Sequence, residues 1–357
     1  MNAPTSDPAL RRAVVLGAVV FAVVAPAVLS NYLRSLAADA LISGMIVLSL
    51  VVLTGLVGQI SFCQYSFAAL GAFTVGSLVA GHHWSFWMAL IVGTAFAAAG
   101  GVLVGIPALR LSGLFLAILT VAVALFFDRF LLAPGTWNAF SGGVEPWRPA
   151  RPSIAGISLD GSYAFYLFVL AVFLLTSLLV WNLRRGKVGR VLRAIRGSEL
   201  AAATVGLDLT AWKLAAFGVS AGLAGLAGGL SAVAVGSVSA GSYDFLHSVS
   251  VAAVAIVMGV GTVASAAAGG LFLAFGPWLL QHTPLSTQYF NLIVGGLLVL
   301  QLVFTPQGLV AHNEQLVLAW RARILARRRA ADVSAPPDDL DRPPATDELV
   351  TSTEVSA

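Results

Sequence analysis

The chain has 357 residues, of which 58% are hydrophobic and only 10% are charged, with a net charge of +4 and a mean hydropathy of +0.90. Soluble domains carry about a quarter charged residues, so this composition excludes a soluble globular protein and indicates a polytopic membrane protein. The basic balance does not indicate a nucleic-acid-binding protein, because the chain contains no basic soluble domain.

The N-terminal region contains Arg11 and Arg12 followed by an apolar run to Leu29, a pattern that resembles a signal peptide. Because many apolar runs follow and no clear small-x-small cleavage site is present, we expect a retained first helix. The single cysteine, Cys63, lies within an expected span, so an intramolecular disulfide is excluded.

Apolar runs of about 20 residues predict an all-helical membrane protein with about ten spans. They are expected at 13–30, 37–56, 60–80, 85–106, 111–132, 163–182, 212–235, 247–263, 264–281 and 287–305. With the N-terminus inside, all Lys and Arg residues fall on the cytoplasmic side except Arg34, Arg129, Arg148 and Arg151. This strong positive-inside pattern sets the orientation and favours an even number of spans.

The same topology predicts how the chain is divided. The expected segments are a cytoplasmic N-terminus (1–12), a transmembrane domain (13–306) with an external loop (133–162) and a cytoplasmic loop (184–213), a basic juxtamembrane segment (307–329) and a disordered cytoplasmic tail (330–357). The basic segment is expected on the inner membrane surface, attracted to anionic lipid. The tail is rich in Pro, Asp, Ser and Thr and lacks the large apolar groups of a core.

Two short sequences match within the chain, GLVGQIS at 55–61 and GLAGGLS at 225–231. In the predicted topology the spans that contain them cross the membrane in opposite directions, which is expected of an inverted-topology repeat. A chance match between helices rich in Gly, Ala and Leu is the alternative.

No catalytic, metal or cofactor site is predicted. The five histidines are scattered without metal-ligand spacing, and the chain contains neither HExxH nor a Walker A sequence. The only acids near the membrane interior, Asp39 and Asp128, lie close to the outer ends of spans, and Asp128 adjoins Arg129 as an expected interfacial pair. The chain therefore lacks the buried acids that are typical of ion-coupled carriers, and ATP-driven transport would need a partner that hydrolyses ATP.

A polar stretch at 58–73, GQISFCQYSFAALGAF, supplies the candidate substrate pathway: Gln59, Ser61, Gln64 and Ser66. Uncharged donors and acceptors of this kind can contact a polar solute, or can hydrogen-bond between packed helices. The stretch Ser61–Ser66 is expected to be a partly broken helix, since irregular backbone is tolerated where it lines a cavity.

The long polar interruption at 184–213 is strongly basic. Within it, 188–205 lacks proline and is rich in Ala, Leu and Arg, so we expect a short surface helix. Arg190, Arg193 and Arg196 recur at every third residue and would share one broad face.

Four landmarks together resemble the membrane permease subunits of branched-chain amino acid ABC importers, in the M-type branch of the Liv system. They are GQISFCQYSFAALGAF (58–73), GIPALRLSGLFLAILT (105–120), SGGVEP (141–146) and GRVLRAIRGSELAAATVGLDLTAWKLAAF (189–217), and the resemblance covers about 30–310. It implies that the cytoplasmic loop docks on an ATPase subunit. The coupling residues carried over by position are Gly189, Arg190, Arg193, Ala194, Arg196, Glu199, Ala201, Ala202 and Gly206.

The resemblance also implies partners and a location. They are a second homologous permease, two cytoplasmic ATP-binding subunits and an external solute-binding protein, in a bacterial inner membrane with both chain termini cytoplasmic. Cys63-Gln64 stands where family members often have Gly-His, and Leu200 where the general importer loop pattern has Glu. The solute is therefore expected to be a branched-chain amino acid or a related small polar molecule. The alternatives are a stand-alone secondary transporter or channel, and a membrane scaffold or enzyme subunit.

Overall fold

The computed structural model describes residues 17, 19–27, 29–133, 140, 146–154, 157–282 and 289–304. All of them belong to one compact unit, Thr5–Asn313. The predicted cytoplasmic N-terminus (1–12), the basic segment (307–329) and the tail (330–357) lie outside the described residues.

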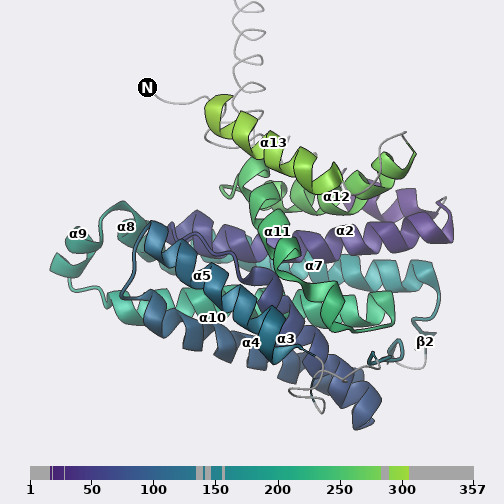
Figure 1. The fold of residues 1–357 in the computed structure, drawn as a ribbon. Helices are drawn as coiled ribbons and strands as arrows, with labels where there is room; N and C mark the ends of the chain where they lie inside the picture. The colour runs from purple at the N-terminus through teal and green to yellow at the C-terminus, as the bar shows by residue number, and fades with distance from the viewer. Residues whose placement is uncertain are drawn as a thin grey trace, which may run out of the picture. The chain divides into compact units, whose positions relative to one another are not determined.

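Helices make up almost all of the described chain, as the sequence predicts (Figure 1). Three of the α-helices continue as π-helices: α2 (Asn31–Leu50) into η1 (Val51–Val57), α3 (Gln64–Gly76) into η2 (Ser77–Gly81), and α5 (Leu114–Phe126) into η3 (Phe127–Leu131). The others are α4 (Phe86–Ala108), α7 (Ser162–Arg185), α8 (Lys187–Gly197), α9 (Glu199–Thr204), α10 (Leu209–Val235), α11 (Phe245–Met258), α12 (Val263–Gln281), α13 (Phe290–Phe304) and the 3₁₀ turn η4 (Ala240–Tyr243). A two-residue antiparallel pair, β1 (Ser153–Ile154) and β2 (Ile157–Ser158), lies between α5 and α7.

Seven helical segments within the described residues are long and apolar enough to cross a membrane. They are Asn31–Val57, Phe86–Ala108, Leu114–Leu131, Ser162–Arg185, Leu209–Val235, Gly241–Met258 and Val263–Gln281. The predicted spans at 13–30, 60–80 and 287–305 also contain helix but are not among these seven; Phe290–Gln301 is a shorter apolar helix. The all-α, polytopic prediction is confirmed. Asp128 and Arg129 also pair as expected, with 3.5 Å between Oδ2 and Nε.

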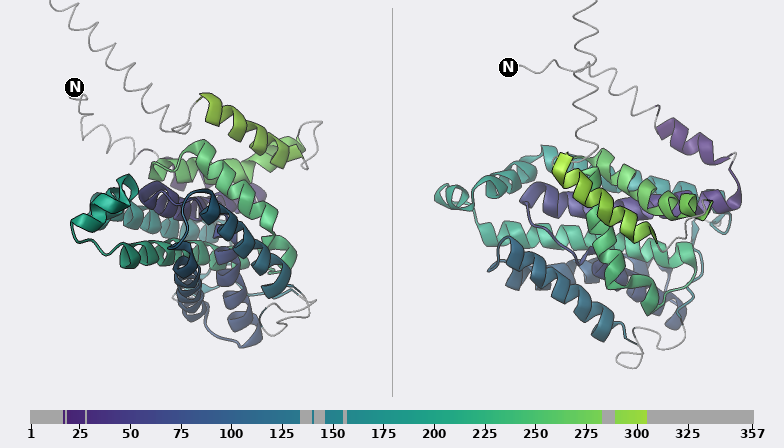
Figure 2. Two further views of the ribbon diagram at one scale, coloured as in Figure 1. Left: turned by 60° about the vertical axis from the view of Figure 1, so that its left-hand side comes forward. Right: turned by 45° about the horizontal axis from the view of Figure 1, so that its top comes forward.

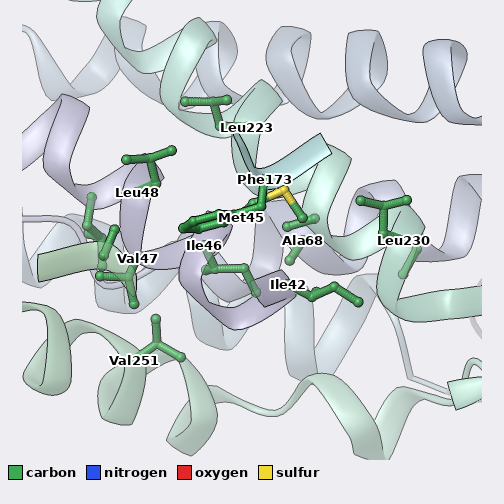
Figure 3. Close-up of a cluster of buried hydrophobic side chains, with 14 of the residues drawn as sticks. Ile42, Met45, Ile46, Val47, Leu48, Ala68, Phe173, Leu223, Leu230 and Val251 are labelled. Carbon is green, nitrogen blue, oxygen red and sulfur yellow. The ribbon is translucent and has the colours of Figure 1, made fainter. Parts of the chain in front are cut away.

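The core forms where α2 and α10 meet the neighbouring helices. Figure 3 shows Ile42, Met45 and Leu48 of α2 with side chains from α3, α7, α10 and α11, including Ala68, Phe173, Leu230 and Val251. Glycines permit the closest approaches: a Cβ atom on Gly71 would collide with the backbone of Gly225, and one on Gly228 with the backbone of Ala68. Small residues at such positions let helices pack through backbone contacts, which is the main means of association when lipid is the solvent.

α2 and α10 run antiparallel. Ala38 shares a small cavity with Ala234 at one end, Ser220 Oγ donates to the Ser49 carbonyl oxygen at 2.8 Å near the middle, and Val52 shares a cavity with Ala216 at the other end. The packing is also reciprocal, because α4 lies along α10 while α12 lies along α2 (Figures 1 and 2). One helix of the N-terminal half thus packs on the long helix of the C-terminal half, and the reverse also holds. This arrangement supports the inverted-repeat hypothesis.

Candidate functional site

A non-helical break, residues 58–63, separates η1 from α3 and contains the first of the predicted pathway residues. Gly58 begins it with φ +81, a left-handed conformation that side chains other than glycine rarely adopt. The Gly58 N–H donates to the Thr54 carbonyl oxygen at 3.2 Å, and Thr54 Oγ1 donates to the Gln59 carbonyl oxygen at 3.0 Å. The break therefore lies within 58–63, slightly earlier than the predicted Ser61–Ser66, and α3 begins regularly at Gln64.

Gln64 is at the centre of a buried polar network between three helices. Gln64 is buried, with 2% of its surface exposed. Its Nε2 donates to Ser220 Oγ of α10 at 3.1 Å. Its Oε1 accepts from Ser49 Oγ of α2, also at 3.1 Å. Ser61 Oγ lies 3.5 Å from Gln64 Nε2 and 3.3 Å from Cys63 Sγ, so the break is connected to the same network. The network can hold α2, α3 and α10 in one arrangement with uncharged groups alone.

The other two pathway candidates, Gln59 and Ser66, are also buried. Gln59 Oε1 has no hydrogen-bond partner within the described residues. Ser66 lies on the first turns of α3, two residues beyond Gln64. The structure thus brings Ser61 and Gln64 into one network and places Gln59 and Ser66 on either side of it along the chain.

Further polar residues hold the break from two other helices, and sequence reasoning missed them. Thr120 Oγ1 of α5 accepts from the Phe62 N–H at 3.1 Å. Ser248 Oγ of α11 accepts from the Tyr65 N–H at 3.3 Å and donates to the Phe62 carbonyl oxygen. With Ser49 and Ser220, these are single hydroxyls in apolar helices. Such hydroxyls commonly bond to their own helix backbone, so sequence alone does not distinguish the ones that bond across helices.

The basic loop forms two helices, α8 and α9, where the sequence predicts one helix within 188–205. Ser198 separates them in an extended conformation and accepts the Ala201 N–H on its Oγ at 3.2 Å, which makes it the N-cap of α9. α8 buries Gly189, Leu192 and Ile195 and exposes Arg190, Arg193 and Arg196. A Cβ atom on Gly189 would collide with the last carbonyls of α7, so this glycine lets α8 turn back against α7.

The arginines of this loop bond to backbone carbonyls. Arg196 Nη1 donates to the Gly55 carbonyl oxygen at 2.6 Å, and Arg193 Nη1 donates to the Arg184 carbonyl oxygen at 2.8 Å. Arg190 Nη1 lies 3.4 Å from the Arg185 carbonyl oxygen. Arg184 Nη2 in turn donates to the Gly261 carbonyl oxygen between α11 and α12. α8 is therefore fastened to the ends of two membrane helices, η1 and α7.

The most exposed apolar side chains of the loop lie on α9 and on its C-cap residue, Val205. Leu200 is 78% exposed and Val205 is 81% exposed, whereas Ala202 is buried. Glu199 Oε2 lies 2.6 Å from Lys213 Nζ, which ties the start of α9 to α10. Ala194 and Ala201 are exposed, and Gly206 has φ +84. We call the exposed set of Arg190, Arg193, Ala194, Leu200, Ala201 and Val205 the loop surface.

Comparison with known proteins identifies the family of this chain. The family described as branched-chain amino acid transport system, permease component, matches residues 31–302. The chain belongs to this permease family. The high-affinity branched-chain amino acid transport system permease protein LivM of Escherichia coli K12 is 32% identical over an alignment of 312 residues, and the match covers 82% of this chain and 73% of that protein. LivM of Salmonella typhimurium LT2 is 31% identical over the same length and the same shares of the two chains. No solved structure matches the chain.

The M-type resemblance inferred from the sequence landmarks is thus confirmed. The chain is a multi-pass membrane permease of an ABC import system, and its family is one of transport permeases, with no known enzyme activity. In this permease two features stand out: a non-helical segment, 58–63, that joins a buried network, and a basic loop that bonds to η1 just before that segment.

Proposed function

We propose that this permease forms half of a translocation pathway for branched-chain amino acids or a related small polar solute. It would pair with a second homologous permease, two cytoplasmic ATP-binding subunits and an external solute-binding protein. ATP binding and hydrolysis in the partner subunits would move the α8–α9 loop, and the loop would pass that movement to the spans, alternately opening the pathway to either side. The LivM relatives, which are named as permeases of high-affinity branched-chain amino acid transport, favour this solute class.

The loop surface carries the proposal. Leu200 and Val205 expose apolar side chains at an end of the bundle that also carries several arginines, outside the apolar helices. An apolar side chain flanked by cations suits a groove on a soluble partner, which would cover the apolar atoms and pair the cations with acids. α8 and α9 together would be the docking element, with Arg190, Arg193, Leu200 and Val205 at its surface.

The proposed orientation agrees with the contacts at the two ends. A Cβ atom on Gly55 would collide with the Val260 carbonyl, and Arg184 bonds to Gly261. The end of η1, the end of α7 and the connection between α11 and α12, all predicted to be cytoplasmic, therefore meet at one end of the bundle. Trp147 and Val238, from two predicted external segments, exchange backbone hydrogen bonds of 3.2 and 2.8 Å. Figure 1 shows α8 and α9 at the opposite end of the bundle from β2. With the basic residues of 184–213 inside, the whole arrangement follows the positive-inside rule.

The Gln64 network supports an uncharged or zwitterionic solute. The residues that connect α2, α3 and α10 are amides and hydroxyls without net charge. A secondary carrier driven by ions usually places acids within the membrane, and no acid takes part in this network. The energy for transport would therefore come from the ATP-binding partners.

Mild-detergent purification of the tagged chain from its native membrane, followed by mass spectrometry, tests the assembly. We expect two ATP-binding subunits and a second permease to copurify, and the reconstituted complex to take up leucine, isoleucine or valine only with ATP and the binding protein. Recovery of the chain alone, with solute transport in proteoliposomes that lack ATP, would establish the stand-alone transporter instead.

A further inference from the structure

One of the three arginines of α8 differs from the others in what it contacts. Arg190 and Arg193 bond to Arg185 and Arg184, the last residues of the adjoining helix α7. Arg196 instead reaches η1, where Nη1 lies 2.6 Å from the Gly55 carbonyl oxygen. Its contact thus joins two segments separated by more than a third of the chain, the basic loop and the end of the span Asn31–Val57.

The aliphatic part of Arg196 also lies directly on Gly58. A Cβ atom on Gly58 would stand 2.9 Å from Arg196 Cγ, 3.3 Å from Cδ and 3.4 Å from Nε. A side chain at this position would force the arginine to shift. Two features therefore favour glycine at position 58: its left-handed backbone conformation and its contact with the Arg196 side chain.

The hydrogen bond is well placed at the end of η1. The last carbonyls of a helix have no partner within the helix, and a cation near them also interacts favourably with the helix dipole. Within the described residues Arg196 makes no ion pair, so its strongest bond is to a neutral carbonyl. Because Arg196 is exposed at the surface of α8, this bond can be broken and remade without leaving a charge buried.

The residue that Arg196 covers is the first residue of the break. From Gly58 the chain runs through 59–63, and Ser61 near its far end contacts Gln64 Nε2. A displacement of α8 would therefore act on Gly58 through Arg196 and on the Gln64 network through the intervening residues. The contacts of the break with Thr120 of α5 and Ser248 of α11 do not involve the loop.

We propose that Arg196 is a positioning residue that fastens α8 to the start of the 58–63 break, so that movement of the cytoplasmic loop reorients the break and the Gln64 network. This inference rests on the proposed ATP-coupled function and assigns the transmitting contact within it. Arg196 thereby has a different role from Arg190 and Arg193, which remain on the loop surface. Docking on the ATPase would use the exposed face of the loop, and transmission would use Arg196.

The test uses the whole complex in proteoliposomes, with Arg196→Gln, Arg196→Lys and a control, Lys187→Gln. Lys187 is an exposed cation in the first turn of the same helix, so its loss removes the same charge without touching Gly55 or Gly58. We expect Arg196→Gln to lower the solute transported per ATP hydrolysed by about tenfold, a typical coupling between sites, while the ATP-binding subunits still copurify. Arg196→Lys should recover part of the ratio, because an ammonium group also donates to a carbonyl. Lys187→Gln should behave as the wild type.

The glycine on the other side of the contact gives a second test. Gly58→Ala and Gly236→Ala form a matched pair, because both glycines end a membrane helix in a left-handed conformation, with φ +81 and +72. A Cβ atom added to Gly236 would meet no other atom within 4 Å, whereas one added to Gly58 would contact Arg196. Both variants should lower the yield through backbone strain, but only Gly58→Ala should lower the solute transported per ATP.

Cys63 provides a readout inside the break itself. It is the single cysteine of the chain and is fully buried. We expect alkylation of the Cys63 peptide, followed by mass spectrometry, to increase during ATP turnover in the wild type and to stay at the resting level in Arg196→Gln. A wild-type complex without ATP-dependent uptake would refute the proposed function. A coupled wild type together with unchanged uptake per ATP and unchanged Cys63 labelling in Arg196→Gln would refute only the role of Arg196.

Discussion

Lys213 of α10 is buried, with 6% of its side chain exposed, and its Nζ lies 2.6 Å from Oε2 of Glu199, whose side chain is 55% exposed. Glu199 is one of the residues that the family resemblance assigns to ATPase coupling. In this structure it ties α9 to the first transmembrane turns of α10. The loop surface therefore rests on an ion pair whose cation would be buried without a partner if Glu199 were lost.

We expect Glu199→Ala to lower the free energy of unfolding by roughly 1–3 kcal/mol, the cost of losing a hydrogen bond to a charged group. The partial exposure of Glu199 screens the pair and keeps the cost in this range. The double variant Glu199→Ala with Lys213→Met should be more stable than Glu199→Ala alone, because it removes the unpaired buried cation. Denaturation in detergent, analysed as a double-mutant cycle, measures the coupling; purely additive effects would show that the pair contributes nothing.

The close packing of α3 against α10 makes a prediction at Gly228. A Cβ atom at Gly228 would collide with the Ala68 backbone, so Gly228→Ala must separate the helices and should cost about 1–3 kcal/mol, as overpacking usually does. Gly295→Ala is the control, since Gly295 also lies in a helix but has empty space within 4 Å. Thermal unfolding in detergent should show a lower midpoint for Gly228→Ala alone. Equal midpoints would mean that α3 and α10 are less closely packed than described.

A substitution at Gln64 can distinguish a structural role of its network from a role in transport. Gln64→Leu removes the bonds to Ser49 and Ser220 and should lower stability by only about 1 kcal/mol, because both serines keep backbone acceptors. If the network also contacts solute, the KM for uptake or the order of preference among leucine, isoleucine and valine should change. Thr74→Val is the control, a buried hydroxyl on the same helix whose hydrogen bond within the described residues is to Leu70 of that helix. Unchanged transport kinetics in Gln64→Leu would leave Gln64 with a packing role.

The loop surface predicts where the ATP-binding partner docks. Replacing both Leu200 and Val205, which are exposed in this chain, by Ser should weaken binding of the partner about tenfold or more, because fully burying a Leu or Val side chain contributes about 1.5–3 kcal/mol. Ala203→Ser, an exposed change on the same helix, should leave the complex intact. Titration of purified ATP-binding subunit against the permease in detergent measures the Kd. If the double substitution left the Kd unchanged, the docking site would not be on α9.

Several candidate site residues can be named from sequence because their chemistry is conspicuous in an apolar chain. Gln64 and Ser61 interrupt a membrane span with polar groups, and the arginines of 184–213 form the longest basic interruption in the membrane domain. Ser49, Thr120, Ser220 and Ser248 were missed, because a lone hydroxyl in a helix has the same sequence pattern whether it bonds to its own backbone or to another helix. Arg196 was identified as a member of a cationic face, but not as the residue that reaches Gly55.

The hypothesis of an inverted-topology repeat shows the same limit. The sequence match pairs Gly55 with Gly225, whereas the structure gives Gly58 and Gly236 the equivalent place, each ending a long helix in a left-handed turn. Glycines are frequent throughout these helices because close packing requires them, so short matches between them occur in more than one register. Only the reciprocal packing of α4 on α10 and α12 on α2 indicates which helices correspond.

By itself the sequence determined that this protein is a helical membrane permease and approximately where its spans lie, and it predicts which loop is cytoplasmic. These properties follow from hydropathy and charge, which act on each segment separately and can be read along the chain. The tertiary structure decided which hydroxyls form the Gln64 network, that the loop is two helices, and that Arg196 lies on Gly58. These are contacts between residues far apart in sequence, and they depend on how closely glycine-lined helices approach one another, which no single segment specifies.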